Sequence, residues 1–106
     1  MSKVKIHFLI PSRRKIKRGE SLNILVGIHT DEEESFIHEF KIFGDIGYGF
    51  REILSRKNMV EPGGNPHYYL TIPSEVFCDD YWGEEIEEIF IAMDERGSHG
   101  SMIFIE

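Results

Sequence analysis

The stretch SLNILVGIH, residues 21–29, places an aliphatic side chain at every second position. One face of this stretch carries Leu22, Ile24, Val26 and Ile28, and the other carries Asn23, Leu25, Gly27 and His29. Successive side chains of a β-strand point to opposite faces, so a period of two predicts a strand with one face in a core.

The same period recurs along most of the chain. It predicts strands in KVKIHFLI (3–10), SFIHEFKIF (35–43), HYYLTIP (67–73), IEEIFIAM (86–93) and SMIFIE (101–106), with a shorter one in FREIL (50–54). In the first of these, Val4, Ile6, Phe8 and Ile10 are expected to face inward, and Phe90 is expected to be buried in the fifth. Residues 55–66 are expected to form a loop, and Ser74 to cap a single helical turn.

About seven short strands separated by turn signals are typical of an antiparallel β-sandwich. We therefore expect an all-β, immunoglobulin-like sandwich that forms one domain over residues 1–106. Two motifs resemble the sandwich modules of bacterial and archaeal proteins: the KRGE turn before the second strand (17–20) and the DERG hairpin before the last (94–97). The resemblance implies an architecture and leaves the function open.

Charge is unevenly distributed in this chain of 106 residues, whose net charge is -7. Residues 1–18 hold seven of the twelve basic residues and no acid, so residues 19–106 carry a net charge of -14. A net-negative domain is a poor nucleic-acid binder, because neutralising phosphates supplies most of that affinity. No apolar run reaches the roughly 20 residues that a membrane-spanning helix needs. The single cysteine excludes an internal disulfide and indicates a reducing, cytoplasmic location.

The histidines raise the possibility of a metal site. GESLNILVGIH (19–29) and SHG (98–100) resemble segments of superoxide reductase, a sandwich family that binds non-haem iron through four histidines and a cysteine. That resemblance implies His29, His38 and His99 among the ligands, but Arg96 stands where the family has its cysteine, and Cys78 lies in another segment. A redox iron site needs its thiolate and imidazoles to converge. We therefore expect no metal and no other cofactor, and keep a small metalloprotein as the alternative.

The turn at residues 30–35 is expected to place His29 and His38 on neighbouring antiparallel strands. Two orientations remain open for the second of these strands. Either His38 is partly buried with Phe36, Phe40 and Ile42, or Ile37 and Phe43 define the inward face.

Two charged segments are the candidate binding residues. Asp79, Asp80, Tyr81 and Trp82 combine aromatic side chains with acids that would attract a basic partner, although Trp82 packing over one end of the sandwich would explain the same residues. The second segment contains Arg13, Arg14 and Lys15, which are either a solvated loop or a patch for an acidic surface.

No nucleophile motif or phosphate-binding loop occurs in the sequence, so we do not expect an enzyme. The sequence favours a non-catalytic protein-binding or assembly module, with self-association through the opposite charge patches as one form of it. A carbohydrate-binding accessory domain is a further alternative, because an exposed tryptophan can stack on a sugar ring.

Overall fold

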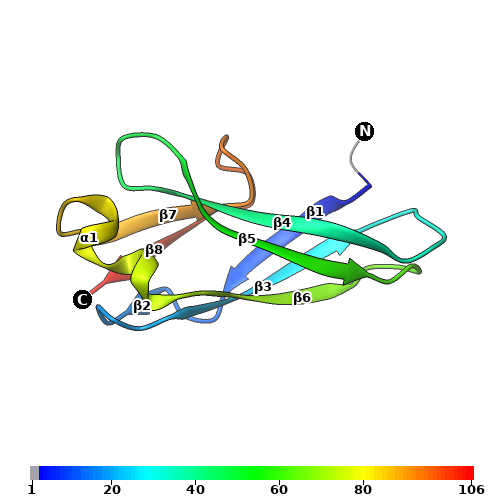
Figure 1. Cartoon of the computed structure of the whole chain (residues 1–106), viewed down its shortest axis with the longest axis horizontal. Coiled ribbons are helices and arrows are strands. Elements are labelled where there is room, and N and C mark those ends of the chain that lie inside the picture. Colours follow the sequence, from blue (N-terminus) through cyan, green and yellow to red (C-terminus); the bar gives the residue numbers. More distant parts are fainter. Residues whose placement is uncertain (1–2) are drawn as a thin grey trace.

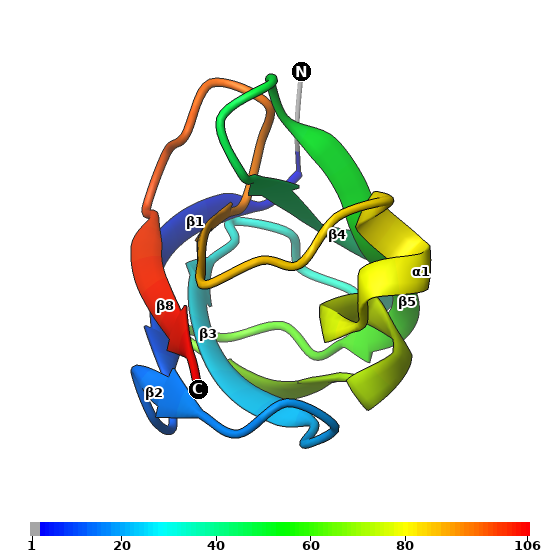
Figure 2. The ribbon, with the colours of Figure 1, turned by 90° about the vertical axis from the view of Figure 1, so that its left-hand side faces the viewer.

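A computed structural model describes residues 3–106, which form an all-β sandwich of two sheets (Figures 1 and 2). The three-stranded sheet has the order β1 (Lys5–Pro11), β3 (Leu22–His29), β6 (His67–Ile72). The five-stranded sheet has the order β2 (Lys15–Ile16), β8 (Ser101–Ile105), β7 (Glu88–Ala92), β4 (Phe36–Asp45), β5 (Arg51–Val60). Two single helical turns, η1 (Ser74–Phe77) and α1 (Asp79–Trp82), connect β6 to β7. The described residues thus contain eight strands, against about seven expected.

The core lies between the two sheets and is built from the inward faces of their strands. The expectation for β3 is confirmed, because Leu22, Ile24, Val26 and Ile28 are all buried. From the opposite sheet they meet Phe40 and Ile42 of β4, Ile89 and Ile91 of β7, and Ile103 of β8. All strand pairs are antiparallel except one. The two-residue strand β2 pairs in parallel with the last two residues of β8.

The first strand does not keep the alternation that its sequence predicts. The pairing of β1 with β3 shifts register between Ile6 and Phe8, which is a β-bulge. An extra residue in one strand moves every later side chain to the opposite face. Leu9 and Pro11 are consequently buried, while Ile10 is 51% exposed, so the prediction that Phe8 and Ile10 face inward was wrong.

The prediction of a loop over residues 55–66 was wrong for residues 55–60, which belong to the ten-residue strand β5. This strand pairs with β4 from Phe36↔Val60 to Gly44↔Arg51. It lies at the edge of the sheet, where polar side chains can remain in water, so its sequence lacks a strong apolar signal. Long-range pairing with β4, and not local propensity, makes it a strand.

The prediction that Phe90 is buried in β7 was wrong, because the residues on either side of it face the core instead. Ile89 and Ile91 are fully buried, whereas Phe90 is half-buried on the outer face, where its ring lies over Gly100. Ser74 likewise does not cap η1, because the capping position is Pro73 and no side chain bonds to the turn. Within residues 3–106, no helix is long and apolar enough to cross a membrane.

Candidate binding surfaces

Trp82 closes one end of the sandwich. Its indole Nε1 donates a hydrogen bond of 2.6 Å to the backbone carbonyl of Val76, and its ring packs against the buried core. Tyr81 lies beside it with ring centroids 5.2 Å apart, and its hydroxyl bonds the carbonyl of Glu52 at 3.3 Å. Both aromatic side chains are therefore engaged within the chain.

Arg51 covers these two rings from β5. Its guanidinium carbon lies 4.0 Å from the ring centre of Tyr81 and 5.4 Å from that of Trp82, and Nη1 donates to the carbonyl of Tyr81 at 2.9 Å. The cation–π contacts and the hydrogen bond hold α1 against the sheet. The arrangement matches the structural interpretation of Trp82 better than that of an open interface.

The acidic and basic segments meet within the chain through Arg18. Its guanidinium contacts Asp79 at 2.8 Å and Glu85 at 3.4 Å, and also donates to the carbonyl of Ile86 at 3.0 Å. Asp80 of the same turn is exposed. These contacts link the loop after β2 to the connection before β7, which lie far apart in the sequence.

The predicted basic patch is partly neutralised by carboxylates of its own chain. Arg13 pairs with Glu20 at 3.0 Å, and Lys15 pairs with Glu106 at 3.4 Å. The backbone hydrogen bond from Lys17 and the contact with Arg13 hold the pKa of Glu20 below its usual value. Among the described residues, the exposed guanidinium of Arg14 has no side-chain partner.

The histidines proposed as metal ligands do not converge. His29 ends β3 in one sheet, His38 lies on β4 in the other, and His99 lies in the β7–β8 hairpin at a φ of 55°. The expectation that His29 and His38 are on neighbouring strands was wrong, because residues 30–35 cross from one sheet to the other so that β3 and β4 can share the core. Within residues 3–106 no group of three or more histidine, cysteine, aspartate or glutamate side chains is arranged to hold a metal ion.

Of the three histidines considered as ligands, the two on strands, His29 and His38, have distinct environments. His38 shares the inward side with Phe40, its ring 4.7 Å away, and burial lowers the pKa of His38. His29 is hydrogen-bonded to Asp31 at 2.9 Å and to Asn65 at 3.1 Å, and these bonds raise the pKa of His29. The first of the two orientations considered for β4 is therefore correct.

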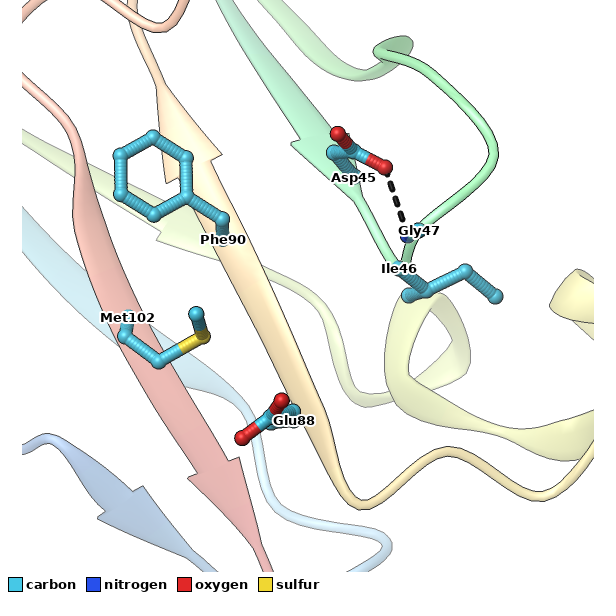
Figure 3. Close-up of a pocket in the computed structure, with 6 residues that line it drawn as sticks. All are labelled: Asp45, Ile46, Gly47, Glu88, Phe90 and Met102. Carbon is cyan, nitrogen blue, oxygen red and sulfur yellow. Dashed lines mark hydrogen bonds between the residues drawn. The ribbon is translucent and has the colours of Figure 1, made fainter.

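A recess of about 240 Å³ lies on the outer face of the five-stranded sheet (Figure 3). Phe90 and Met102 line it from β7 and β8, with Glu88 below them and Asp45 across from them. The carboxylate of Asp45 already accepts hydrogen bonds from the backbone N–H groups of Gly47 and Gly49 at 2.7 and 3.1 Å. Asp45 thus shapes its loop, and Glu88 is the remaining charged group in the recess.

The outer face of the three-stranded sheet carries an apolar row that the sequence did not single out. Ile10, Leu25 and Tyr69 are paired across β1, β3 and β6, and Tyr69 is 78% exposed. In the next row, the rings of Phe8 and His67 meet edge to face at 5.3 Å across Gly27. We call these five side chains (Phe8, Ile10, Leu25, His67 and Tyr69) the β1–β3–β6 face.

Gly27 is required for this arrangement. A Cβ atom at this position would lie 2.1 Å from Cε2 of Phe8, so any side chain would displace the ring. The glycine therefore lets Phe8 lie flat over β3 and reach His67.

Tyr69 separates two shallow recesses at the β1–β3–β6 face. One, of about 290 Å³, is mostly apolar and includes Ile10 and Leu25. The other, of about 340 Å³, lies toward β5 and includes Arg56, Asn58 and Thr71. An exposed aromatic ring is thus flanked by apolar surface on one side and by hydrogen-bond donors on the other.

The sequence contained part of the signal for this face. Leu25 falls on the polar side of the 21–29 alternation, and Tyr69 falls on the outward side of 67–73, but two isolated apolar residues are normal on a surface. The bulge in β1, which adds Phe8 and Ile10 to them, has no signature in the residues themselves.

Comparisons with known proteins give a likeness of fold alone. The sequence matches no protein-family model and no curated protein. Among solved structures, it is similar to a β-glucosidase, EmGH1, from Erythrobacter marinus, with a TM-score of 0.73, 16% identity and coverage of 97% of this chain. A β-glucosidase from Listeria innocua gives a TM-score of 0.63 and 14% identity over 99% of this chain. The chain spans only 15% and 16% of the lengths of those two proteins.

Proposed function

We propose that this chain is a non-catalytic binding module with an immunoglobulin-like arrangement, which docks a partner protein on its β1–β3–β6 face. The observation that carries the proposal is the row of Ile10, Leu25 and Tyr69, in which Ile10 and Tyr69 are exposed and Leu25 is half-buried. Contiguous apolar surface on a soluble domain marks an interaction site more often than scattered apolar residues do. A sheet face also offers a flat platform on which a second surface can pack.

The two outer faces of the sandwich differ in the charged and polar side chains that they carry. On β4 and β5, Lys41 contacts Glu39 at 3.6 Å and Glu52 at 3.1 Å, so charged side chains cover part of these two strands at one edge of the five-stranded sheet. On the three-stranded sheet the polar pair Asn23 and Thr71, bonded at 2.8 Å, borders the apolar row.

The segment 79–82 is a weaker candidate for the docking site. Its aromatic side chains contact Arg51, Val76 and the core, so a partner would have to displace contacts that stabilise the fold. Tyr69 has no such role, since its ring is largely in water. The likeness of the whole chain to a small part of larger proteins supports a modular role.

Matched tyrosine variants test this proposal. Tyr69 and Tyr48 are 78% and 81% exposed, but Tyr48 lies in the loop after β4. Wild type, Tyr69→Ala and Tyr48→Ala are used as baits in quantitative affinity purification from the source organism. We expect at least one protein that wild type and Tyr48→Ala retain equally and Tyr69→Ala loses. Equal retention by all three baits would contradict the proposed surface.

A carbohydrate ligand is the second candidate for the same face. It is favoured by the position of Tyr69 beside Arg56 and Asn58, because a ring with adjacent hydrogen-bond donors can hold a sugar, and the similar solved structures are β-glucosidases. Native gel electrophoresis with soluble β-glucans in the gel tests it. Retardation of wild type and Tyr48→Ala, but not of Tyr69→Ala, would replace the protein partner with a polysaccharide.

A further inference from the structure

The charge of the three-stranded sheet is opposite to that of the molecule as a whole. The chain has a net charge of -7, yet β1, β3 and β6 contain no aspartate or glutamate. The charged or chargeable residues of these strands are Lys5 and the histidines His7, His29 and His67. Arg13 and Arg14 follow directly beyond β1, and Arg56 lines the recess beside Tyr69.

The two carboxylates that flank β3 most closely in the sequence are already engaged. Asp31, just beyond β3, is bonded to His29, and Glu20, just before it, is paired with Arg13. The β1–β3–β6 face therefore combines apolar side chains with positive charge from Lys5, Arg14 and Arg56 at its borders, in a domain whose net charge is negative. Complementary charge selects partners and excludes those of like charge.

We propose, on the basis of the binding function above, that this face binds an extended acidic segment of a partner protein with an apolar anchor residue. The anchor contacts Ile10 and Leu25 in the recess on one side of Tyr69. A carboxylate of the segment binds Arg56 on the other side. Arg56 donates one hydrogen bond, from Nη1 to the carbonyl of Ser55 at 2.9 Å, and a guanidinium has five N–H groups in all.

A second copy of this chain fits the face less well. An isologous dimer would place the same surface on both molecules, so the basic borders of one copy would face the basic borders of the other. Like charges brought together in this way oppose association. An acidic partner meets no such repulsion.

A display library of random 16-residue peptides tests the inference. The library is selected on immobilised wild type, and single enriched peptides are then measured on wild type, Tyr69→Ala, Arg56→Ala and Tyr48→Ala. We expect acid-rich peptides with an aromatic or aliphatic residue. Their affinity should fall at least tenfold in Tyr69→Ala, fall severalfold in Arg56→Ala, and stay unchanged in Tyr48→Ala. Replacing their acids with the corresponding amides should weaken binding about tenfold.

The outcomes separate this inference from the function on which it rests. Neutral or basic peptides that still require Tyr69 would overturn the acidic partner and leave the docking surface in place. Enrichment that is equal on wild type and Tyr69→Ala, or no enrichment on either, would overturn both. A dimer seen in sedimentation velocity and lost in Tyr69→Ala would assign the face to a second copy and overturn the acidic segment. Circular dichroism of each variant checks that it is folded.

Discussion

Removing the Trp82 side chain should destabilise the protein although the residue looks like a binding residue in the sequence. A fully buried tryptophan or phenylalanine changed to alanine costs about 3–5 kcal/mol. Trp82 is half-buried, which reduces the packing loss to about half of that, and its indole hydrogen bond to Val76 adds roughly 1 kcal/mol. We therefore expect Trp82→Ala to lower the free energy of unfolding by about 2.5–3.5 kcal/mol.

Urea unfolding followed by far-ultraviolet circular dichroism measures this loss without relying on the fluorescence of Trp82, the only tryptophan. Trp82→Phe keeps most of the packing and loses the hydrogen bond, so it should cost about 1 kcal/mol. Tyr69→Ala, at an exposed position, should cost less than about 0.5 kcal/mol. A loss below 1 kcal/mol for Trp82→Ala, or a loss for Tyr69→Ala that exceeds the loss for Trp82→Ala, would refute the assignment of a structural role to Trp82 and a binding role to Tyr69.

Further predictions concern acid stability, packing, association and metal content. Burial lowers the pKa of His38, so the unfolded chain binds more protons than the folded chain near pH 6, and stability should fall as the pH drops below about 6.5. His38→Phe should reduce this loss in urea titrations at pH 7 and pH 5. An unchanged pH dependence in the variant would count against this role of His38. The pKa of His29 is raised, so His29 stabilises the fold more at low pH, and His29→Gln should increase the loss of stability on acidification. Gly27→Val should cost about 1–3 kcal/mol by displacing Phe8, and no loss on thermal unfolding would show that the ring moves freely. Self-association of the basic and acidic segments stays a prediction: light scattering should show it fading between 0.1 and 1 M salt and in Arg14→Glu, whereas salt-independent oligomers would rule it out. Elemental analysis after dialysis should find no stoichiometric iron or zinc, and about one metal per chain would revive the metalloprotein alternative.

The inward faces of most strands could be predicted from the sequence because burial imposes a strict period on them. Leu22 to Ile28 in β3 and Leu70 and Ile72 in β6 follow that period without interruption. The strand β5 was missed because an edge strand depends on pairing with β4 and needs few apolar residues of its own. Phe90 was misassigned because both faces of its strand are apolar, so periodicity alone does not orient it.

The binding surface was harder to predict than the fold. Sequence reasoning favoured Trp82 and its acids, since composition shows which residues are unusual but not which contacts they make inside the chain. The β1–β3–β6 face depends on a bulge near Phe8 that turns Ile10 outward, and on alignment of Leu25 with Tyr69 across strands about 40 residues apart in the sequence. Both are tertiary features that local patterns do not contain.

Site-specific photocrosslinking in the source organism tests the proposed surface most directly. A benzophenone amino acid replaces Tyr69 in one strain and Tyr48 in a second, so that the same reactive group is displayed at two similarly exposed positions on different surfaces. After irradiation, we expect a discrete crosslinked protein band from the Tyr69 position and none of that mass from the Tyr48 position. The same band from both positions, or a band from the Tyr48 position alone, would contradict docking on the β1–β3–β6 face.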